Sequence, residues 1–427
     1  PSVLVGQLQD AIAAGWVLED AGPDVGKRTQ AKDPGQQLVE HLTTEHPLQP
    51  FSREYFRPEQ RKLRTYAREW GEVWRHCQSD IHSARAAGSE RQLPIAVPEG
   101  AIHLAELNEF YRQPVSAFLR RRLGINLQKR DDVAPPPEDE PFHLNKLEEW
   151  QVRDELLKQL MREENVENID DVLNGRLKAI RLEGRLPLAK PGKKLADKVL
   201  KEACEIGTRY FEECNRHGSK LAPFSVKLSF DTAVQDVGRV AIEDWLGNLR
   251  SSDNTVRVRV ELLASKLGTE KSPAWDKLVR FWPEHLAGCA MGLNMKTILV
   301  GQDNTLSFEP VKKKTAVEWL QELVRDSLIA QARPLPITPV VSGKYLEISV
   351  QKADKPEEEW IDEAMGKAGI AYIGNSYLPG PLVREPALAR LFPDFGALRG
   401  NDDDGFAYWS ERVYGNMVRS FIAQRGQ

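Results

Sequence analysis

The stretch FDTAVQDVGRVAIEDWLGNL (residues 230–249) alternates apolar and polar side chains, which predicts a β-hairpin with one buried face. Next, VRVRVEL (256–262) predicts a third strand, and AWDKLVRFWPEHLAGCAM (274–291) predicts a helix that packs over the strands. Helices before and after a set of strands are typical of mixed sheets covered on their faces. The sequence therefore predicts an α/β fold, with a mixed sheet flanked by helices.

Metal-dependent nucleases of the PD-(D/E)XK type require acidic side chains at fixed places on such strands. An Asp near the end of the second strand and a (D/E)-x-Lys on the third bind one metal ion, because residues two apart share a face. Here the alignment puts Gly247 at the Asp position, or Ala241 in a shifted register. The residue two before Lys266 is Ala264, and Glu261 falls on the opposite strand face. We interpret Gly247 and Ala264 as lost active-site positions of an inactivated nuclease-like domain, and expect no catalytic residue and no metal.

The sequence also allows two other functions. The first is an active magnesium nuclease with divergent ligands, for which Glu243, Asp244 and Glu261 are the candidates. It requires these carboxylates to converge within about 5 Å, the separation at which they could share a cation. The second is a pure protein-docking domain that does not bind DNA.

Composition restricts the class of protein. The chain has 427 residues, of which 41% are hydrophobic and 29% charged, so it is long enough for two or three domains. A net charge of −4 argues against non-specific coating of nucleic acid, and limits any DNA contact to a local patch. The four cysteines form no C-x-x-C pair, which disfavours zinc and iron–sulfur sites. Without an apolar run long enough to span a membrane, or a signal peptide, we expect a cytoplasmic protein without membrane contact.

The regions outside the predicted sheet differ in character. Residues 1–30 open with a helical pattern that starts without Met, which suggests a fragment of a longer polypeptide. Residues 31–98 read as an extended docking linker, in which Phe51, Tyr55 and Phe56 are candidate anchors for partner proteins. Residues 99–427 form the remaining domain. Its further predicted elements are helices at 102–123 (broken at Pro114), 144–161, 193–214, 315–332, 355–368 and 406–421, a strand at 297–300, a stiff acidic connector at 131–140 and an acidic loop at 401–405.

Candidate DNA contacts are few. Arg120, Arg121 and Arg122 end a predicted helix, where they either stabilise the helix dipole or contact phosphate. Lys193 and Lys194 precede a predicted helix, as do the lysines at 312–314, where positive charge is unfavourable to the helix. They are therefore either phosphate contacts or part of a solvated surface. Trp245 on the hairpin is expected in the core, with base stacking as its functional alternative.

Several segments, in order along the chain, resemble the C-terminal part of the exodeoxyribonuclease V gamma-subunit family, RecC. They are PSVLV (1–5), YAREW (66–70), PVSAFLRRRL (114–123), EPF (140–142), WPEHLAGCA (282–290) and FAYWSERVY (406–414). The resemblance implies that residues 1–30 are the last helix of an inactivated helicase-like domain, followed by an inactivated nuclease-like domain. It also implies a non-catalytic scaffold in double-strand break repair by homologous recombination, which splits or guides double-stranded and forked DNA. The implied partners are the beta and alpha subunits of the RecBCD complex, RecB and RecD, which use Mg and ATP, whereas this chain holds no cofactor.

Overall fold

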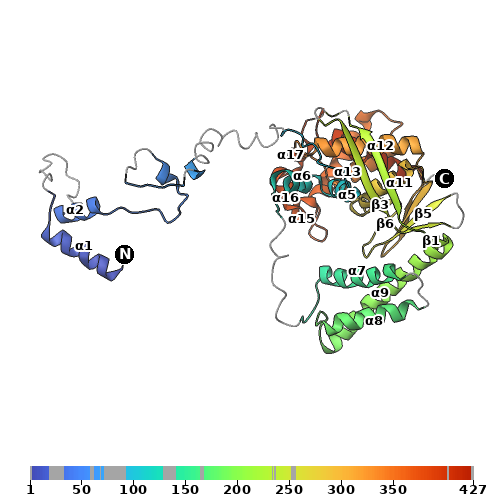
Figure 1. Cartoon of the computed structure of the whole chain (residues 1–427), viewed down its shortest axis with the longest axis horizontal. Coiled ribbons are helices and arrows are strands. Elements are labelled where there is room, and N and C mark those ends of the chain that lie inside the picture. Colours follow the sequence, from blue (N-terminus) through green and yellow to red (C-terminus); the bar gives the residue numbers. More distant parts are fainter. Residues whose placement is uncertain are drawn as a thin grey trace. The chain divides into compact units, whose positions relative to one another are not determined.

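The chain divides into two compact units, Pro1–Glu90 and Arg91–Gln427. The computed structural model describes residues 2–18, 33–57, 62–67, 69–71, 93–127, 141–163, 168–232, 234, 237–251, 256–401 and 403–424. Elements are labelled as in Figure 1. The acidic connector at 131–140 lies outside the described residues.

The first unit is built from short elements. Its helix α1 (Val3–Gly15) packs against α2 (Pro34–Leu42), and a 3-10 turn, η1 (Arg53–Phe56), follows. A Cβ atom on Gly35 would lie 1.8 Å from the carbonyl oxygen of Ala13, so only glycine permits this approach of the two helices. None of the side chains of α1 is buried. The predicted N-terminal helix is therefore present, with its apolar side chains exposed within this unit.

The second unit contains a five-stranded mixed sheet in the order β1-β4-β5-β8-β9. Its strands are β1 (Ser219–Lys220), β4 (Leu249–Ser251), β5 (Arg257–Leu262), β8 (Met295–Val300) and β9 (Thr305–Phe308). Only β5 and β8 pair in parallel among these, with Val260 opposite Ile298, and the other pairs are antiparallel. A parallel pair requires a long crossover, which the predicted helix between them provides. The strands predicted at 256–262 and 297–300 are confirmed.

The predicted hairpin forms, but it is displaced along the chain. It consists of β2 (Phe224–Asp231) and β3 (Arg239–Leu246), which pair with each other in a separate two-stranded sheet. The prediction places the first strand too late, because Phe230 is near the end of β2 instead of its beginning. Thr232 closes the turn: its amide and its hydroxyl both donate to the carbonyl of Gly238.

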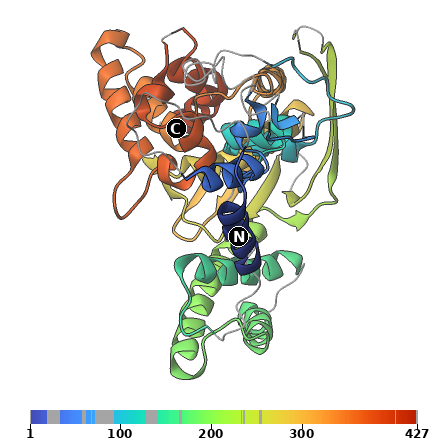
Figure 2. The same cartoon turned by 90° about the vertical axis from the view of Figure 1, so that its left-hand side faces the viewer.

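One face of the five-stranded sheet packs on a bundle of three helices, drawn in green in Figure 2. They are α7 (Lys146–Arg162), α8 (Ile169–Leu182) and α9 (Ala189–Arg216). Val258 and Val260 of β5 share a buried apolar cluster with the bundle, as do Ile298 and Val300 of β8. Helix α9 begins four residues before the predicted start at Lys193, since Pro191 fits the first turn of a helix.

The opposite face packs on helices from distant parts of the chain. The crossover comprises α10 (Trp275–Leu278), η3 (Val279–Phe281) and α11 (Trp282–Ala290), and α5 (Leu104–Arg112), α6 (Pro114–Leu123) and α12 (Lys313–Ile329) complete this layer. The helix predicted at 274–291 is thus divided, and Pro283 occupies the first turn of α11, where its missing N–H costs nothing. The predicted break at Pro114 is confirmed, since α6 begins there.

The C-terminal part of the unit is helical. Its elements are α13 (Pro339–Gln351), η4 (Glu357–Glu359), α14 (Ile361–Ile373), α15 (Pro381–Arg384), α16 (Pro386–Leu391), α17 (Phe395–Arg399) and α18 (Phe406–Ala423). The helix predicted at 355–368 begins later, and α13 is not among the predicted elements. Pro339 starts α13, because proline is well accommodated at the first position of a helix. A small two-stranded ribbon, β6 (Gly268–Thr269) and β7 (Ser272–Pro273), precedes α10.

Candidate functional site: a buried charge network

Two charged side chains of β5 point away from the helix bundle and into the opposite layer. Arg259 and Glu261 are two residues apart, so they share a strand face, and each is only 8% exposed. The Nη2 atom of Arg259 lies 2.8 Å from Oε1 of Glu261. The strand therefore carries a buried ion pair on one face and valines on the other.

Side chains from three other elements complete this network. Glu284 of α11 accepts a hydrogen bond from Nη1 of Arg259, and another from Nδ2 of Asn108 on α5 at 3.0 Å. Nδ2 of Asn248 donates to Oε1 of Glu261 at 3.1 Å. Asn248 joins β3 to β4 with φ of 57°, a left-handed conformation that Asn adopts more readily than most residues. One guanidinium thus lies between two carboxylates, with two amide side chains beside them.

Burial makes these charges strongly dependent on each other. Burial raises the pKa of Glu261, and the neighbouring guanidinium opposes this shift. Burial alone lowers the pKa of Arg259, but the two carboxylates more than offset it, so that the net shift is upward. Among the described residues, Nε of Arg259 and Oδ1 of Asn108 are buried without a hydrogen-bond partner. The network is thus not fully satisfied, which is costly at a buried site.

A buried histidine lies beside the network. His285 of α11 is fully buried, and burial lowers its pKa to about 3. Its Nε2 lies 3.1 Å from the carbonyl oxygen of Glu309, and its Nδ1 lies 3.0 Å from the hydroxyl of Thr297. Because a carbonyl can only accept, Nε2 carries the proton and Nδ1 accepts from the hydroxyl. His285 is therefore neutral and adds no charge beside Arg259.

Gly247 and Ala264, interpreted as lost active-site positions, both lie just beyond the ends of strands, and that interpretation stays a prediction. Gly247 directly follows β3, and a Cβ atom there would meet no described atom within 4 Å. However, β5 ends at Leu262, so Ala264 and Lys266 lie beyond the strand. The strand-parity argument applied to them is wrong, because alternation holds only while the backbone is extended. The charged pair on β5 is Arg259-x-Glu261, and Asn248, in the connection between β3 and β4, contacts Glu261.

The divergent ligand set is not assembled. Oδ2 of Asp244 accepts the backbone N–H of Leu104 at 2.8 Å, and its Oδ1 accepts the amide of Trp245. Asp244 therefore stabilises the N-terminus of α5, whereas Glu261 belongs to the Arg259 network. In the described part of the chain, no group of three or more His, Cys, Asp or Glu side chains could hold a metal ion.

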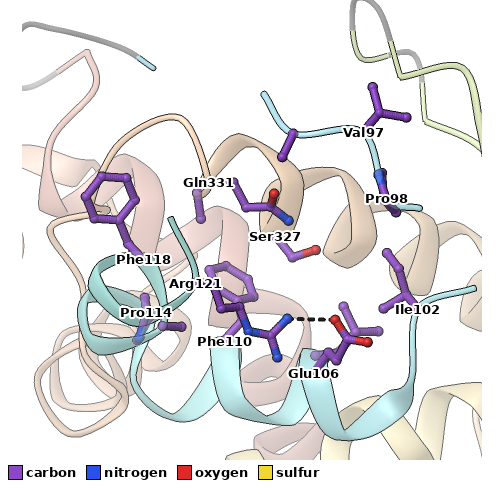
Figure 3. Close-up of a pocket in the computed structure, with 14 residues that line it drawn as sticks. Val97, Pro98, Ile102, Glu106, Phe110, Pro114, Phe118, Arg121, Ser327 and Gln331 are labelled. Carbon is purple, nitrogen blue, oxygen red and sulfur yellow. Dashed lines mark hydrogen bonds and ion pairs between the residues drawn. The ribbon is translucent and has the colours of Figure 1, made fainter. Parts of the chain in front are cut away.

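Each guanidinium of the arginine cluster has a partner within the unit. Arg120 pairs with Glu109 of α5, and Arg121 pairs with Glu109 at 2.7 Å and Glu106 at 2.8 Å. Arg122 donates to the carbonyls of Gln331 and Pro94. Figure 3 shows Arg121 directed at Glu106 at the edge of a hollow of about 130 Å³. The contacts of Arg120 and Arg121 join α6 to α5, and the predicted phosphate contact would have to compete with all of these contacts.

The remaining candidate DNA contacts lie on the surface. Lys193 and Lys194 are exposed within the first turns of α9. Trp245 is 67% exposed, so the expectation of core packing is wrong: it occupies the outer face of β3, while Ile242 and Leu246 are buried. Lys312 immediately precedes α12. Base stacking by Trp245 stays a prediction.

The aromatic anchors of the first unit pack locally. The rings of Phe51 and Trp70 lie 5.5 Å apart, and Phe56 packs under Gly71. The hydroxyl of Tyr55 donates to the carbonyl of Pro47 at 3.4 Å. Their role in docking partners stays a prediction.

Other candidate ligands have structural roles or lie outside the described residues. In the 401–405 loop, Asp404 pairs with Arg333 and accepts a hydrogen bond from the indole of Trp409 at 2.7 Å. Cys204, Cys214 and Cys289 are free thiols. The fourth cysteine, Cys77, is outside the described residues.

The second unit of the chain matches a known protein family. The family model described as RecC C-terminal domain matches residues 99–349. This chain belongs to the RecC C-terminal domain family. The match includes α5, β5 and α11, and therefore every residue of the Arg259 network.

Two relatives carry the same name. The RecBCD enzyme subunit RecC of Escherichia coli (strain K12) is 26% identical over 390 residues, which cover 89% of this chain and 30% of that protein. The RecBCD enzyme subunit RecC of Haemophilus influenzae is 23% identical over 333 residues, or 78% of this chain and 25% of that protein. The chain thus spans less than a third of the length of these RecC relatives. Within the described residues, none of the helices is both long and apolar enough to cross a membrane.

Proposed function

We propose that this chain is a non-catalytic, DNA-handling and docking part of a RecC subunit. In this role it guides or splits the strands of double-stranded or forked DNA beside RecB and RecD, in double-strand break repair by homologous recombination in the cytoplasm. It holds no cofactor, and Mg and ATP are used by the partner subunits. Membership in the RecC C-terminal domain family supports the assembly, and the Arg259 network supports the absence of catalysis.

The single observation that carries the proposal is the reversal of charge on the third strand. A PD-(D/E)XK nuclease needs an acid two residues before a Lys, so that the acid binds the metal and the Lys assists the reaction. On β5 the two residues with that spacing are Arg259 and Glu261, an arginine followed two residues later by an acid. Asn248, a neutral amide in the connection between β3 and β4, donates to Glu261. A cation bound at this position would face a buried guanidinium, which repels it.

An apolar surface on the second unit supports the docking role. Residues 368–383 contain no charged side chain, although 29% of the chain is charged. Five large apolar side chains of this segment are exposed: Ile370, Ile373, Tyr377, Leu378 and Val383. Exposed apolar patches of this kind are typical of protein interfaces, and the lack of Lys and Arg argues against a phosphate backbone.

The turn in this segment is held in place before any partner binds. Oδ1 of Asn375 accepts the amides of Tyr377 at 3.0 Å and Leu378 at 2.7 Å, and the carbonyl of Leu378 accepts the amide of Asn375. Tyr377 lies in this turn and is 97% exposed. A fixed turn loses little conformational entropy on binding, and Tyr is frequent among interface hot spots. We propose that Tyr377 and Leu378 insert into an apolar pocket of a partner subunit.

Co-purification with RecB and RecD tests the docking role. The double variant Tyr377→Ala/Leu378→Ala should weaken assembly at least about tenfold, because each buried anchor contributes more than about 1 kcal/mol. Leu182→Ala is the matched control, since Leu182 is also an exposed leucine, 80% against 66% for Leu378, and lies on α8. Equal assembly of the double variant and the control would refute docking through the turn. Phe51→Ala/Phe56→Ala tests the first unit in the same way.

A nuclease assay tests the absence of catalysis. We expect no cleavage of linear or forked DNA by the purified chain in Mg²⁺ or Mn²⁺. Cleavage that is lost in Asp244→Ala would instead establish the divergent nuclease.

The pure docking domain remains the second candidate, favoured by the partners that the structure gives to Arg120, Arg121 and Arg122. Salt-dependent binding of forked DNA by the chain would exclude it, because phosphate contacts release counterions.

A further inference from the structure

A pocket of about 300 Å³ lies between the end of α5, the crossover helices and the starts of α13 and α15. Four cationic side chains and two carboxylates line it, namely Arg112, Lys277, Arg280 and Arg384 with Asp276 and Glu385. Four positive and two negative charges leave a net charge of +2 in the pocket, whereas the whole chain has a net charge of −4. Positive charge is therefore concentrated in this pocket of an otherwise acidic chain.

Two of the four cations balance the two carboxylates. The Nζ atom of Lys277 lies 2.7 Å from Oδ2 of Asp276. Burial raises the pKa of Glu385, and among the lining cations Arg384 opposes this shift most strongly. The other two cations, both arginines, carry the surplus positive charge.

These two arginines, Arg112 and Arg280, lack an acidic partner of their own. Within the described part of the chain, neither side chain makes a hydrogen bond or an ion pair, and Nε of Arg280 is buried. Burial lowers the pKa of Arg280, and the charge of Arg112 lowers it further. Of the two carboxylates that oppose this shift, Asp276 belongs to the ion pair above and Asp154 pairs with Lys158 at 2.7 Å. Two guanidiniums therefore repel each other at the wall of one pocket.

The start of α13 forms another part of the same wall, through Thr338, Pro339 and Val340. Thr338 is the N-cap residue, but its side chain makes no hydrogen bond to the backbone of the helix. Its hydroxyl instead donates to Oε1 of Glu385 at 3.5 Å. The positive end of this 13-residue helix therefore adds to the charge of the two arginines.

An oxyanion with two charges fits this arrangement best. Guanidinium groups bind phosphate and carboxylate oxygens through paired N–H donors, in strong charge-assisted hydrogen bonds. A carboxylate has one negative charge, as does a phosphodiester inside a nucleic-acid strand, whereas a phosphate monoester has about −1.5 to −2 at pH 7. The surplus of two positive charges therefore favours a terminal or free phosphate group.

We propose that Arg112 and Arg280 bind a phosphate dianion in this pocket, either inorganic phosphate or the phosphate of a monoester. The bound phosphate would neutralise the two guanidiniums and join the end of α5 to η3. Its source is either a small molecule, such as free phosphate or a nucleotide, or the terminal phosphate of a DNA strand. The site requires no partner subunit, so this inference goes beyond the proposed function.

Titration calorimetry of the whole chain with inorganic phosphate and with methyl phosphate, at constant ionic strength, tests the site. Arg112→Gln and Arg280→Gln should each weaken the binding of both ligands at least about tenfold, because each removes charge-assisted hydrogen bonds. Arg390→Gln is the matched control and should keep the wild-type affinity, since Arg390 is an exposed arginine on α16 that does not line the pocket. Dimethyl phosphate, a diester with a single charge, should bind at least about tenfold more weakly than methyl phosphate.

A thermal melt separates binding from folding. Without phosphate, Arg112→Gln should unfold at or above the wild-type midpoint, because it removes the repulsion between the two guanidiniums. Phosphate at about ten times its wild-type dissociation constant should raise the wild-type midpoint by about 2–3 °C, and that of either Gln variant by less than about 1 °C. If Arg280→Gln does not fold, Arg112→Gln alone decides.

The outcomes distinguish the sources of the phosphate. Tighter binding of duplex DNA with phosphorylated ends than with dephosphorylated ends, lost in Arg112→Gln, would assign the site to DNA termini. Equal binding of the two duplexes, with phosphate still bound, would assign it to a small phosphate compound.

Two results would overturn the site. One is equal phosphate affinity of Arg112→Gln and the control Arg390→Gln, and the other is acetate raising the wild-type midpoint as much as phosphate does. Cleavage of DNA by the wild type, or failure to assemble with RecB and RecD, would refute the proposed function and leave the phosphate site standing.

Discussion

Replacing Arg259 by Met should destabilise the chain far more than replacing either carboxylate that contacts it. The guanidinium is 8% exposed and is the only cation of the network among the described residues. Without it, Glu261 and Glu284 face each other at a buried site with no neutralising charge. Removal of one member of a buried ion pair costs about 3–5 kcal/mol, and we expect a loss in this range.

Glu261→Gln should have a much smaller effect. Arg259 retains Glu284, the introduced amide is close in shape to the carboxylate that it replaces, and the net charge of the network falls from −1 to zero. Burial raises the pKa of Glu261, which means that the folded state disfavours its charged form. The ionised carboxylate therefore does not stabilise the fold at neutral pH relative to the neutral form. We expect a change within about 1 kcal/mol.

Urea unfolding of the two single variants and of Arg259→Met/Glu261→Gln measures these values as a double-mutant cycle. The double variant should be more stable than Arg259→Met alone, because it has one buried charge fewer. The reasoning is refuted if Arg259→Met costs less than about 1 kcal/mol, or if Glu261→Gln costs as much as Arg259→Met.

Three further predictions concern other parts of the second unit. Gly343→Ala should lower the free energy of unfolding by about 1–3 kcal/mol, measured in a thermal or urea melt, because the new Cβ would lie 2.1 Å from the ring of Trp275. Gly366→Ala should instead raise it by up to about 1 kcal/mol, because Gly366 lies inside α14 with open space around it. Burial raises the pKa of Glu385 to about 7 from 4.5, so the unfolded state loses this proton first, and stability should fall as pH rises from about 4.5 to 7. Glu385→Gln should remove about 3 kcal/mol of that pH dependence, since the pKa rises from 4.5 to about 7 and one pKa unit corresponds to about 1.4 kcal/mol; identical pH profiles of variant and wild type would contradict this. Changing Arg120–Arg122 to Gln should reduce the slope of log affinity for forked DNA against log salt concentration by about one per lost phosphate contact. If the cluster has only a structural role, this slope is unchanged and only the midpoint of thermal unfolding falls.

Much of the fold follows from local periodicity. Alternation over 256–262 identifies β5 because its valines face the helix bundle on one side only. The limits of the helices are harder to predict, since the start of α9 and the division at Pro283 depend on how a proline fits a first turn. The prediction for Trp245 is wrong because the outer face of a hairpin cannot be distinguished from its inner face when both carry large side chains.

The sequence by itself contains half of the candidate site. Arg259 and Glu261 are opposite charges two residues apart on a strand whose other face carries valines, a pattern that indicates an ion pair, whereas the nuclease alignment selects Lys266 instead. Glu284 and Asn108 could not be identified in this way, because they belong to helices far away in sequence and meet Arg259 only when α5 and α11 pack on the sheet. Periodicity reports which face of an element is buried, whereas the partner of a buried charge depends on how separate elements pack. The elements and the family were therefore readable from the chain, and the closed charge network was decided by tertiary structure.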